Sequence, residues 1–540
     1  MKYGFLVAVL GCWSCLQAAT LPDNIYFRAM QDEMNRSKKE LRLPDDVKPF
    51  YIAYRVTVNE QQTFSANLGA LTSQVNDDEK QNSPQVRAAV YLYAGDAKQN
   101  SSGLGERDRS FLQSRTVDNY GSLREILWYL TDREYIRAAK RAERKTALKR
   151  EKNLTAQEPE FSRAPQASFI DDITAFVPYD RAPYNALVKE LSEQGKKYPY
   201  VEEYEVRLNL GQQQTYFLDS EGDFSQVQQP KNSVIFRAKF RNKDGLSEDI
   251  QDRYVLPLDK EQTEPFIRQK ATEFLQYVTL MYQAQKGDFY IGPVLLVHDG
   301  VTQFLERLLV NNLSNTKPLL MESNLEDPSV GKLAKKTGRR ILSTGLDVTD
   351  RPSLRMFDGF ALAGFRPIDA EGVAAQDLQV VENGKLKEIP TIRSLLPGQK
   401  KSNGHARIFN GEYPRAGLSN VFVVPRHALT QKQLEDKLLA LCREQELEYG
   451  YIVHSWQGRV GLNMAERIYT ADGHREPVYG LIAEQENDMR ALRDIVAAGD
   501  NSEVFSAGDF AIVAPSLLIN EIELKPVERD PDRPHLVPMP

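Results

Sequence analysis

Histidine, cysteine and carboxylate side chains are the groups of this chain that could bind a metal or carry acid–base chemistry. The 540 residues include six histidines, which are His298, His405, His427, His454, His474 and His535. Two ligands on one helix must lie three or four residues apart to share a face, and no two of these histidines have that spacing. A metal site built from one local motif is therefore absent, and any site would gather ligands from distant segments.

The most informative stretch is DFYIGPVLLVHDGVTQFLERLLVNNL, which covers residues 288–313. It predicts an apolar strand over Tyr290–Val297 that leads into an amphipathic helix, with Phe304, Leu305, Leu308 and Leu309 on one side. A strand that leads into a helix near the middle of a long chain is a common place for a metal site. The stretch also contains His298, which places one imidazole near this junction.

A second group of candidates lies in two polar blocks, QKKSNGHAR at residues 399–407 and PRAGLSN at residues 414–420. His405, Arg407 and Arg415 could bind the carboxylate or backbone of a peptide. Asn403 and Asn420 complete the set of candidate substrate-binding residues. The alternative is that these side chains order a loop through hydrogen bonds, and the sequence leaves both interpretations open.

These segments together resemble the TldD/PmbA family, the metalloprotease-related proteins once called modulators of DNA gyrase. The blocks above resemble its Ser-Asn-Gly-His-x-Arg and Pro-Arg-x-Gly-x-Ser-Asn motifs, and DAEGV at 369–373 and ENG at 382–384 look like two more. The resemblance covers essentially the whole chain after residue 19. It implies an α+β N-terminal domain, a β-rich C-terminal domain, and a dimer that encloses a cavity.

Catalytic members of the family carry a His-Glu-x-x-x-His zinc motif on the helix of residues 288–313, and this chain lacks it. One alignment starts the motif at His298. It keeps one imidazole, places Asp299 at the general-base position and Gln303 at the second ligand position, and Glu306 follows.

A second alignment, which we prefer from the sequence, starts the motif at Glu306. It follows the apolar strand and leaves His298 in the turn before the helix. It places Arg307 at the base position and Asn311 at the second ligand position. Zinc takes tetrahedral N, S or carboxylate donors, so neither alignment gives a convincing zinc site.

A cysteine near the C-terminus supplies a third zinc ligand in catalytic family members. The corresponding region here, residues 495–524, contains no cysteine. The three cysteines are Cys12, Cys15 and Cys442, and the last lies in an apolar helical stretch that predicts a buried, structural thiol. We therefore expect no zinc and no other cofactor, although catalytic relatives bind zinc.

The N-terminus, MKYGFLVAVLGCWSCLQAAT, predicts a secretory signal peptide over residues 1–19 and an exported protein, periplasmic or secreted. Lipid anchoring at Cys12 is the less favoured alternative. No other apolar run approaches the roughly 20 residues that a membrane span needs. The net charge of −6 and the pI of about 5.8 give no overall signature of nucleic-acid binding.

Composition, with 41% hydrophobic and 27% charged residues, is that of a globular protein, and the length predicts two or three domains. We predict an α+β protein with a mixed α/β domain over residues 20–285 and a β-rich domain over residues 286–540. Residues 121–150 predict a long helix or helix pair, whose basic residues alternate with acids as on a solvated face rather than a nucleic-acid surface. Asn383-Gly384 predicts a hairpin turn. The apolar pattern also predicts helices over residues 23–41, 264–285, 431–445 and 488–498, and two separate strands over residues 49–56 and 64–71.

Three functions follow as hypotheses. The first is a metallopeptidase relative without zinc that holds a peptide or a partner chain in the family's cleft, as a homodimer or a heterodimer with a relative. The second is an active zinc metallopeptidase that cleaves unstructured peptides with dispersed ligands, such as His298, Glu306 and another histidine. The third is a purely structural envelope protein.

Overall fold

The fold is taken from a computed structural model of the chain. It describes residues 20–42, 48–72, 85–91, 111–113, 119–151, 153, 161–314, 331–396, 398–408, 414–457, 461–483 and 489–527. The predicted signal peptide, Cys12, Cys15 and His535 lie outside these residues.

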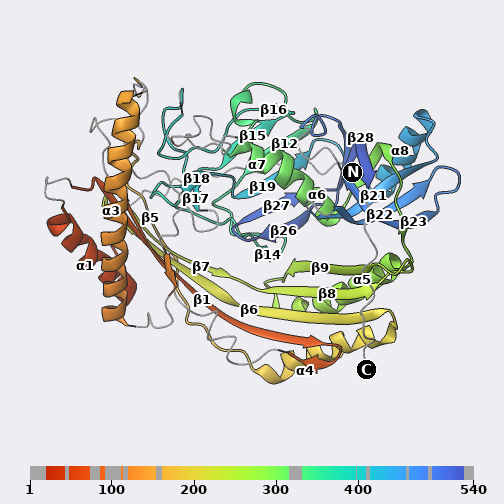
Figure 1. The fold of residues 1–540 in the computed structure, drawn as a ribbon, viewed down its shortest axis with the longest axis horizontal. Coiled ribbons are helices and arrows are strands. Elements are labelled where there is room, and N and C mark those ends of the chain that lie inside the picture. The colour runs from red at the N-terminus through yellow and green to blue at the C-terminus, as the bar shows by residue number, and fades with distance from the viewer. Residues whose placement is uncertain are drawn as a thin grey trace, which may run out of the picture.

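Two very long strands form the centre of the first sheet. β1 (Tyr51–Asn67) and β6 (Val201–Asp219) pair antiparallel from Ala53 and Asp219 to Asn67 and Glu205. Together they run as an arch beneath the rest of the molecule (Figure 1). The sheet order is β4-β3-β1-β6-β7-β5, with β2 beside β1 and β8 between β6 and β9. These further strands are β2 (Ala70–Leu71), β3 (Gln85–Tyr91), β4 (Phe111–Gln113), β5 (Ser168–Ile170), β7 (Phe224–Pro230), β8 (Ser233–Arg241) and β9 (Ser247–Val255).

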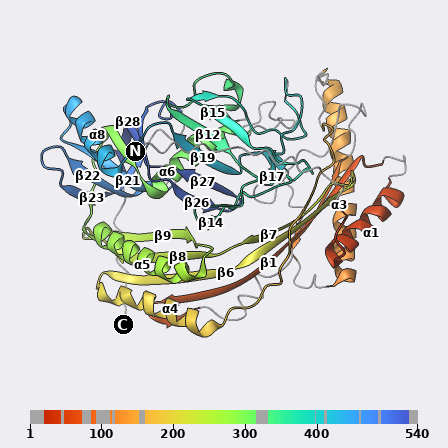
Figure 2. The same ribbon diagram turned by 180° about the vertical axis from the view of Figure 1, so that it is seen from behind.

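Helices cover this sheet at its two ends, as Figures 1 and 2 show from opposite sides. Near one end, α1 (Ile25–Glu40) and the 32-residue α3 (Tyr120–Glu151) share a core with β1, β3 and β6. Near the other, α4 (Arg181–Glu193), the short η1 (Gln194–Lys197) and α5 (Lys260–Gln283) lie by β6 and β8. On α3, Glu134 forms ion pairs with Arg133, Arg137 and Arg141, as the prediction of a charge-paired helix face requires.

The second half of the chain forms two large sheets with one helix between them, and two small sheets of two strands each, β13-β14 and β17-β18. Of the two large sheets, the larger has the order β10-β23-β22-β21-β11-β28-β25-β20, with β24 joining β22 and β28, and the smaller has the order β16-β15-β12-β19-β27-β26. Alternate side chains of β11 (Tyr290–Leu296) explain its continuous apolar sequence, because Val294 and Leu296 face the central helix while Leu295 faces α8 (Gln431–Glu444).

The remaining strands of this half range from two to ten residues. They are β10 (Gln285–Lys286), β12 (Leu346–Asp350), β13 (Met356–Phe357), β14 (Phe360–Ala361), β15 (Leu378–Glu382), β16 (Lys385–Leu386), β17 (Ala406–Ile408), β18 (Pro414–Ala416), β19 (Asn420–Pro425), β20 (Ala428–Leu429), β21 (Tyr449–Gln457), β22 (Gly461–Tyr469), β23 (Arg475–Tyr479), β24 (Leu481–Ala483), β25 (Ile495–Gly499), β26 (Glu503–Ala507), β27 (Phe510–Ala514) and β28 (Leu517–Pro526), with a short helix η3 (Ala334–Lys336).

Most of the predicted elements are confirmed, including α1, α3, α5 and α8. Asn383 and Gly384 have positive φ angles of 45° and 77° and join β15 to β16 as the predicted hairpin turn. Cys442 is fully buried as predicted, and burial raises the pKa of its thiol to about 11.

The prediction of a helix over residues 488–498 is wrong. Residues 495–499 form β25, which pairs antiparallel with β28. Ile495 and Ala498 are buried in the core between the sheets, so tertiary pairing overrides the local helical preference.

The α+β class is confirmed: the N-terminal region mixes helices with a sheet, and the C-terminal region is rich in strands. None of the helices in the described part of the chain combines the length and apolar character that a membrane crossing needs. We keep a domain boundary near residue 285 as a proposal, since the first sheet ends with β9 and β10 belongs to the second.

Candidate functional site

The central helix of the second half begins directly where β11 ends. Its three segments are α6 (His298–Leu305), the π-helical η2 (Glu306–Val310) and α7 (Asn311–Leu313). Val297 donates its backbone N–H to the carbonyl of Val453 on β21, at 2.9 Å. A Cβ atom on Gly300 would lie 2.8 Å from that carbonyl, so only glycine lets the helix approach β21 this closely. The start of α6 is therefore fixed on β21.

This position brings two histidines together that are far apart in the sequence. The rings of His298 and His454 are stacked, with centroids 5.8 Å apart and 22° between their planes. Nδ1 of His298 lies 2.9 Å from Oε1 of Glu503 on β26, and Nε2 of His454 lies 2.9 Å from Oε2 of Glu466 on β22. Four elements thus supply two neighbouring histidine–carboxylate pairs.

His298 has an unusual backbone conformation, with φ at +47°. A non-glycine residue pays a conformational cost there, and such residues cluster at functional sites. His298 is also more than half exposed, since 55% of its side chain is accessible, whereas His454 is mostly covered. The geometry therefore indicates His298 as the accessible member of the pair.

The charged groups around the two histidines act on one another's pKa values, and one of them, Asp252, belongs to the first sheet. The hydrogen bond to Glu503 raises the pKa of His298, although burial opposes it. Burial raises the pKa of Asp252 on β9, although the charges of His298 and His454 act to lower it. Burial would raise the pKa of Glu466, but its hydrogen bond with His454 brings it below the ordinary value. The site therefore lies where β9 of the first sheet meets the second half of the chain.

We expect the pKa of His298 to lie above the ordinary histidine value of about 6.5 and to fall when Glu503 is replaced by glutamine. Because the folded-state pKa is raised, the pair's contribution to stability is complete below the unfolded pKa and is lost as pH rises through the folded pKa. NMR titration of histidine labelled at Cε1 measures this pKa, and a His298→Asn variant assigns the signal.

The matched control for this titration is Asp472→Asn, which removes the partner of the exposed His474 in the turn before β23. It should leave the His298 titration unchanged. A His298 pKa at the ordinary histidine value, or one that does not change in the Glu503→Gln variant, would show that the pair of His298 and Glu503 does not form in solution.

The rest of the degenerate motif lies along the same helix. The Nε2 group of Gln303 donates to the carboxylate of Asp299, so the base position and the second ligand position of the first alignment bind each other. Glu306 and Arg307 are half-buried on η2, where burial raises the pKa of Glu306, and Asn311 is exposed. The premise of the second alignment is wrong, since the helix begins at His298 rather than after it.

Zinc does not fit this set of residues. A zinc ion needs donor atoms that converge on one point. In the part of the chain that the structure describes, the one group of three such donors within 4.8 Å of one another is Asp219, Glu221 and Asp223. The His298 and His454 rings each bind a different carboxylate through one nitrogen, and no third donor in the described residues converges with the two rings.

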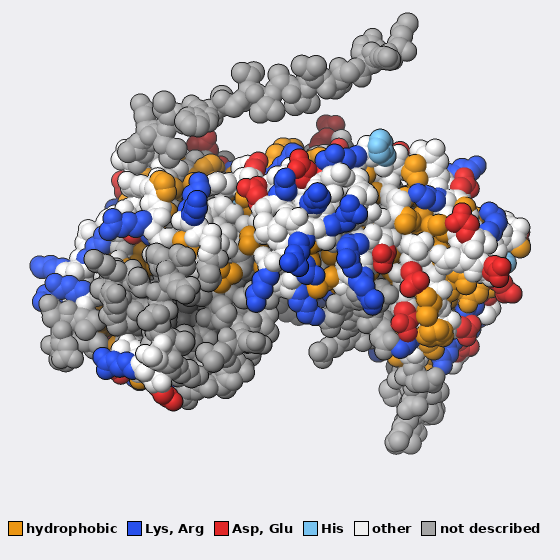
Figure 3. Space-filling view, turned by 90° about the horizontal axis from the view of Figure 1, so that it is seen from above, with side chains coloured by type: hydrophobic (Ala, Val, Ile, Leu, Met, Phe, Trp, Pro, Cys, Tyr) orange, Lys and Arg blue, Asp and Glu red, His pale blue; other side chains and the backbone are white. Residues whose placement is uncertain are grey.

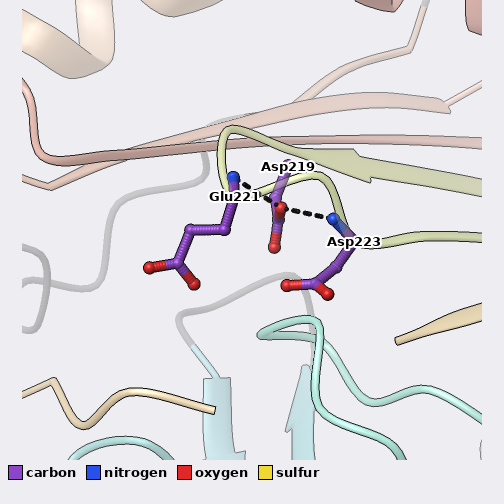
Figure 4. Close-up of side chains that lie close together, drawn as sticks. All are labelled: Asp219, Glu221 and Asp223. Atoms are coloured by element: carbon purple, nitrogen blue, oxygen red, sulfur yellow. Dashed lines mark hydrogen bonds between the residues drawn. The ribbon is translucent and has the colours of Figure 1, made fainter. Parts of the chain in front are cut away.

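The Asp219 group, shown in Figure 4, is a braced turn between β6 and β7 that sequence reasoning missed. Oδ1 of Asp219 accepts the backbone N–H groups of Glu221 and Asp223, and Oδ2 accepts the hydroxyl of Tyr51. Burial and the neighbouring charge of Asp223 raise the pKa of Asp219 to about 8. The alternation of acids in DSEGD was the available signal, and its hydrogen bonds are those of a turn.

Three of the five candidate substrate-binding residues brace loops. Asn403 accepts the N–H of Thr391 and donates to the carbonyl of Ile389, and Asn420 links Gly364 to the carbonyls of Arg351 and Leu354. His405 is buried, with Nε2 3.0 Å from Oδ2 of Asp350 and Nδ1 3.0 Å from the carbonyl of Asn403. This geometry supports the loop-ordering alternative for these three.

The other two candidates, Arg407 and Arg415, lie opposite each other on the paired strands β17 and β18. The guanidinium of Arg407 is buried and donates to the backbone carbonyl of Asp509. Burial, together with the charge of Arg366, lowers the pKa of Arg407 to about 9. Arg407 thus belongs to a group of cations between the two halves of the chain.

Comparisons with known proteins relate the second half of the chain to a protein family and the whole chain to a known fold. Residues 291–525 match the PmbA/TldA metallopeptidase C-terminal domain. Three solved structures share the fold: TldE from Thermococcus kodakarensis, and proteins from Thermotoga maritima and Bacteroides thetaiotaomicron that are named as proposed modulators of DNA gyrase. No curated protein matches the chain.

These structural likenesses extend over almost the whole molecule at low sequence identity. The TldE structure has a TM-score of 0.57 at 15% identity and covers 92% of this chain and 100% of its own. The Thermotoga structure has a TM-score of 0.58 at 14% identity and covers 92% of this chain and 100% of its own. The Bacteroides structure has a TM-score of 0.59 at 13% identity and covers 93% of this chain and 98% of its own.

The second half of the chain is thus a metallopeptidase-related domain on a fold that extends across both halves. Residues 291–525 belong to the PmbA/TldA metallopeptidase C-terminal domain family, and the sequence of the chain has no His-Glu-x-x-x-His motif.

Proposed function

We propose that this protein is an exported TldD/PmbA relative that has lost zinc and hydrolytic activity and holds a peptide or a partner chain in a cleft. One observation carries the proposal: the histidines and carboxylates at the start of α6 pair with one another instead of converging. Each imidazole uses one ring nitrogen for its own carboxylate. In the described part of the chain no group of three metal-binding donors includes either histidine, and zinc takes at least three protein ligands.

The cleft lies where β26 rests against β9. In the described part of the chain both are edge strands, since β26 pairs with β27 alone and β9 with β8 alone. Edge strands have backbone N–H and C=O groups that an extended peptide can bind. A cavity of about 60 Å³ between them is lined by side chains of β9, β26 and the β7–β8 turn.

Metal analysis of the purified protein tests the proposal. We expect far less than one zinc per chain after exposure to zinc and dialysis, and no chelator-sensitive cleavage of an unstructured peptide. Fluorescence anisotropy with the same peptide should show binding. His298→Ala should leave zinc content and any background cleavage unchanged, as should the matched control His474→Ala in an exposed turn.

The opposite result would support the second hypothesis, an active zinc peptidase. It would consist of about one tightly bound zinc per chain and cleavage that is lost with the metal and in His298→Ala. The stacking of His454 on His298 is the one observation that favours this reading. If the protein binds no peptide and retains no partner chain, the third hypothesis, a purely structural envelope protein, would remain.

Export and assembly are part of the same proposal. The signal-like residues 1–19 support export, and mass spectrometry of the mature N-terminus distinguishes cleavage near Ala19 from lipidation at Cys12. A dimer with itself or with a relative is expected from the family, and light scattering of the purified protein measures whether the chain alone forms it.

A further inference from the structure

A group of five cations lies between the two halves of the chain, next to the proposed cleft; four of them are buried or half-buried, and Arg253 is exposed. Its members come from separate segments: Arg55 on β1, Lys231 in the β7–β8 turn, Arg253 on β9, Arg366 after β14 and Arg407 on β17. Asp509, in the turn between β26 and β27, is the acid at their centre. Its carboxylate lies 4.0 Å from Nη2 of Arg366, and its backbone carbonyl accepts from Arg407.

Electrostatic effects show that these cations act on one another. Burial and the charges of Arg366 and Arg87 lower the pKa of Arg55 to about 9. Burial also lowers the pKa of Lys231, and the charges of Arg366 and Arg253 lower it further. Burial would raise the pKa of Asp509, but the surrounding cations hold it below the ordinary carboxyl value. Positive charge is therefore in excess.

Other acids near the group are already occupied. Asp369 also acts on Arg55, but its carboxylate accepts the backbone N–H groups of Glu371, Val373 and Ala406. Asp350 acts on Arg407, but it accepts from Ser419 and Asn420 and binds His405. One exposed carboxylate, that of Asp509, thus faces at least four cations, and the local potential favours an added anion.

The cavity beside this group has the size and lining for such an anion. Its volume of about 60 Å³ is room for a few water molecules, and a carboxylate could replace them. Its charged lining residues are Lys231, Arg253 and Arg355, and no acid lines it. Arg355 is bound to Asp171 and to the carbonyl of Gln228, which leaves Lys231 and Arg253 to face the cavity.

This enclosure distinguishes the group from other basic residues. Lys and Arg side chains also gather near the middle of the outer face in Figure 3, where water solvates them. Arg407 is 2% exposed, and Arg55, Lys231 and Arg366 are half-buried. Cations in such a setting lose much of their hydration, so a partner anion gains more there than at the surface.

We propose that this cationic pocket binds a carboxylate of the peptide in the neighbouring cleft, so that the protein selects acidic peptides. The inference rests on the proposed peptide-binding function. Both an acidic side chain and a free C-terminus supply a carboxylate, and the two sources are separated by the peptides used in the test.

The test measures anisotropy with four labelled unstructured peptides of one length. One carries glutamates and a free C-terminus, and the others replace the glutamates by glutamine, amidate the C-terminus, or do both. We expect the neutral, amidated peptide to bind at least about tenfold more weakly, the factor that corresponds to 1.4 kcal/mol. The two intermediate peptides show which carboxylate is bound.

Lys231→Gln and Arg253→Gln should remove most of this preference and weaken its dependence on salt. The matched control is Arg237→Gln on β8, which removes one charge from an exposed pair with Asp249 and should retain the preference. Salt titration of the unmodified protein covers the case in which a variant fails to fold, since only binding of the acidic peptides should weaken steeply with salt.

The outcomes separate the two proposals. Equal affinity for all four peptides, or a preference unchanged in both pocket variants, overturns the acidic selectivity and leaves peptide binding intact. Failure of every peptide to bind overturns the proposed function and the selectivity with it. Competition by inorganic phosphate as strong as that by the acidic peptide would mean a small-anion site, which also overturns the proposal.

Discussion

Replacing Asp350 by alanine should lower the free energy of unfolding by about 3–5 kcal/mol, because it leaves a buried hydrogen-bond network without its acceptor. Asp350 is fully buried at the end of β12. Its carboxylate accepts the backbone N–H of Ser419 at 2.9 Å and of Asn420 at 2.6 Å, and lies 3.0 Å from Nε2 of His405. In the buried site the alanine variant leaves these donors without the carboxylate that binds them.

Thermal unfolding measures the effect as a lower melting temperature, by roughly 10 °C for a loss of this size. Asp347→Ala is the matched control on the same strand, since Asp347 is partly exposed and pairs with the exposed Arg426. We expect a loss of about 1 kcal/mol or less there. Equal losses for the two variants would contradict the network.

Replacing Arg393 by methionine should have the second largest effect, also about 3–5 kcal/mol. Only 1% of its side chain is exposed. Nε donates to the carbonyl of Ser162 at 2.7 Å, Nη1 donates to Glu221 at 2.6 Å, and the guanidinium lies 3.8 Å from the ring centroid of Phe161. One side chain from the second half thus binds two segments of the first.

Limited proteolysis together with thermal unfolding measures this change. We expect faster cleavage around residues 161–171 in Arg393→Met, because their attachment to the second half is lost. Arg393→Lys keeps the charge but cannot reproduce the planar contacts, so it should lie between the methionine variant and the unmodified protein. Arg426→Met, which removes an exposed arginine, is the control. A cleavage pattern identical to that of the control would show that Arg393 does not join the halves.

The sequence was informative where one element determines its own structure. Apolar periodicity predicted α1, α5, α8 and the strand before α6, and Asn383-Gly384 predicted its turn. The sequence was not informative where the structure of a segment depends on the segments that pair with it. Residues 59–62 interrupt the apolar pattern of β1 and so predict two strands, but they pair with residues 210–213 of β6 and the strand continues.

The candidate site was predicted only in part for the same reason. His298 was identified from its place after an apolar strand. Its neighbours His454 and Glu503 are 156 and 205 residues further along the chain, and only the pairing of β21 beside β11 and of β26 at a sheet edge brings them together. The turn expected at His298 was wrong because no pattern showed that the helix starts at His298 itself, with a positive φ angle.

The middle of the arch formed by β1 and β6 is polar, and it separates the two ends of the arch, which pack in different hydrophobic cores. Apolar side chains of the same two strands serve one core with α1 and α3, and a different core with α4 and α5. Between the cores, residues 59–63 face residues 209–213, and the two segments are joined by backbone and amide hydrogen bonds with few apolar side chains. Bending of the arch therefore concentrates in this span, and each end can keep its packing while the other shifts.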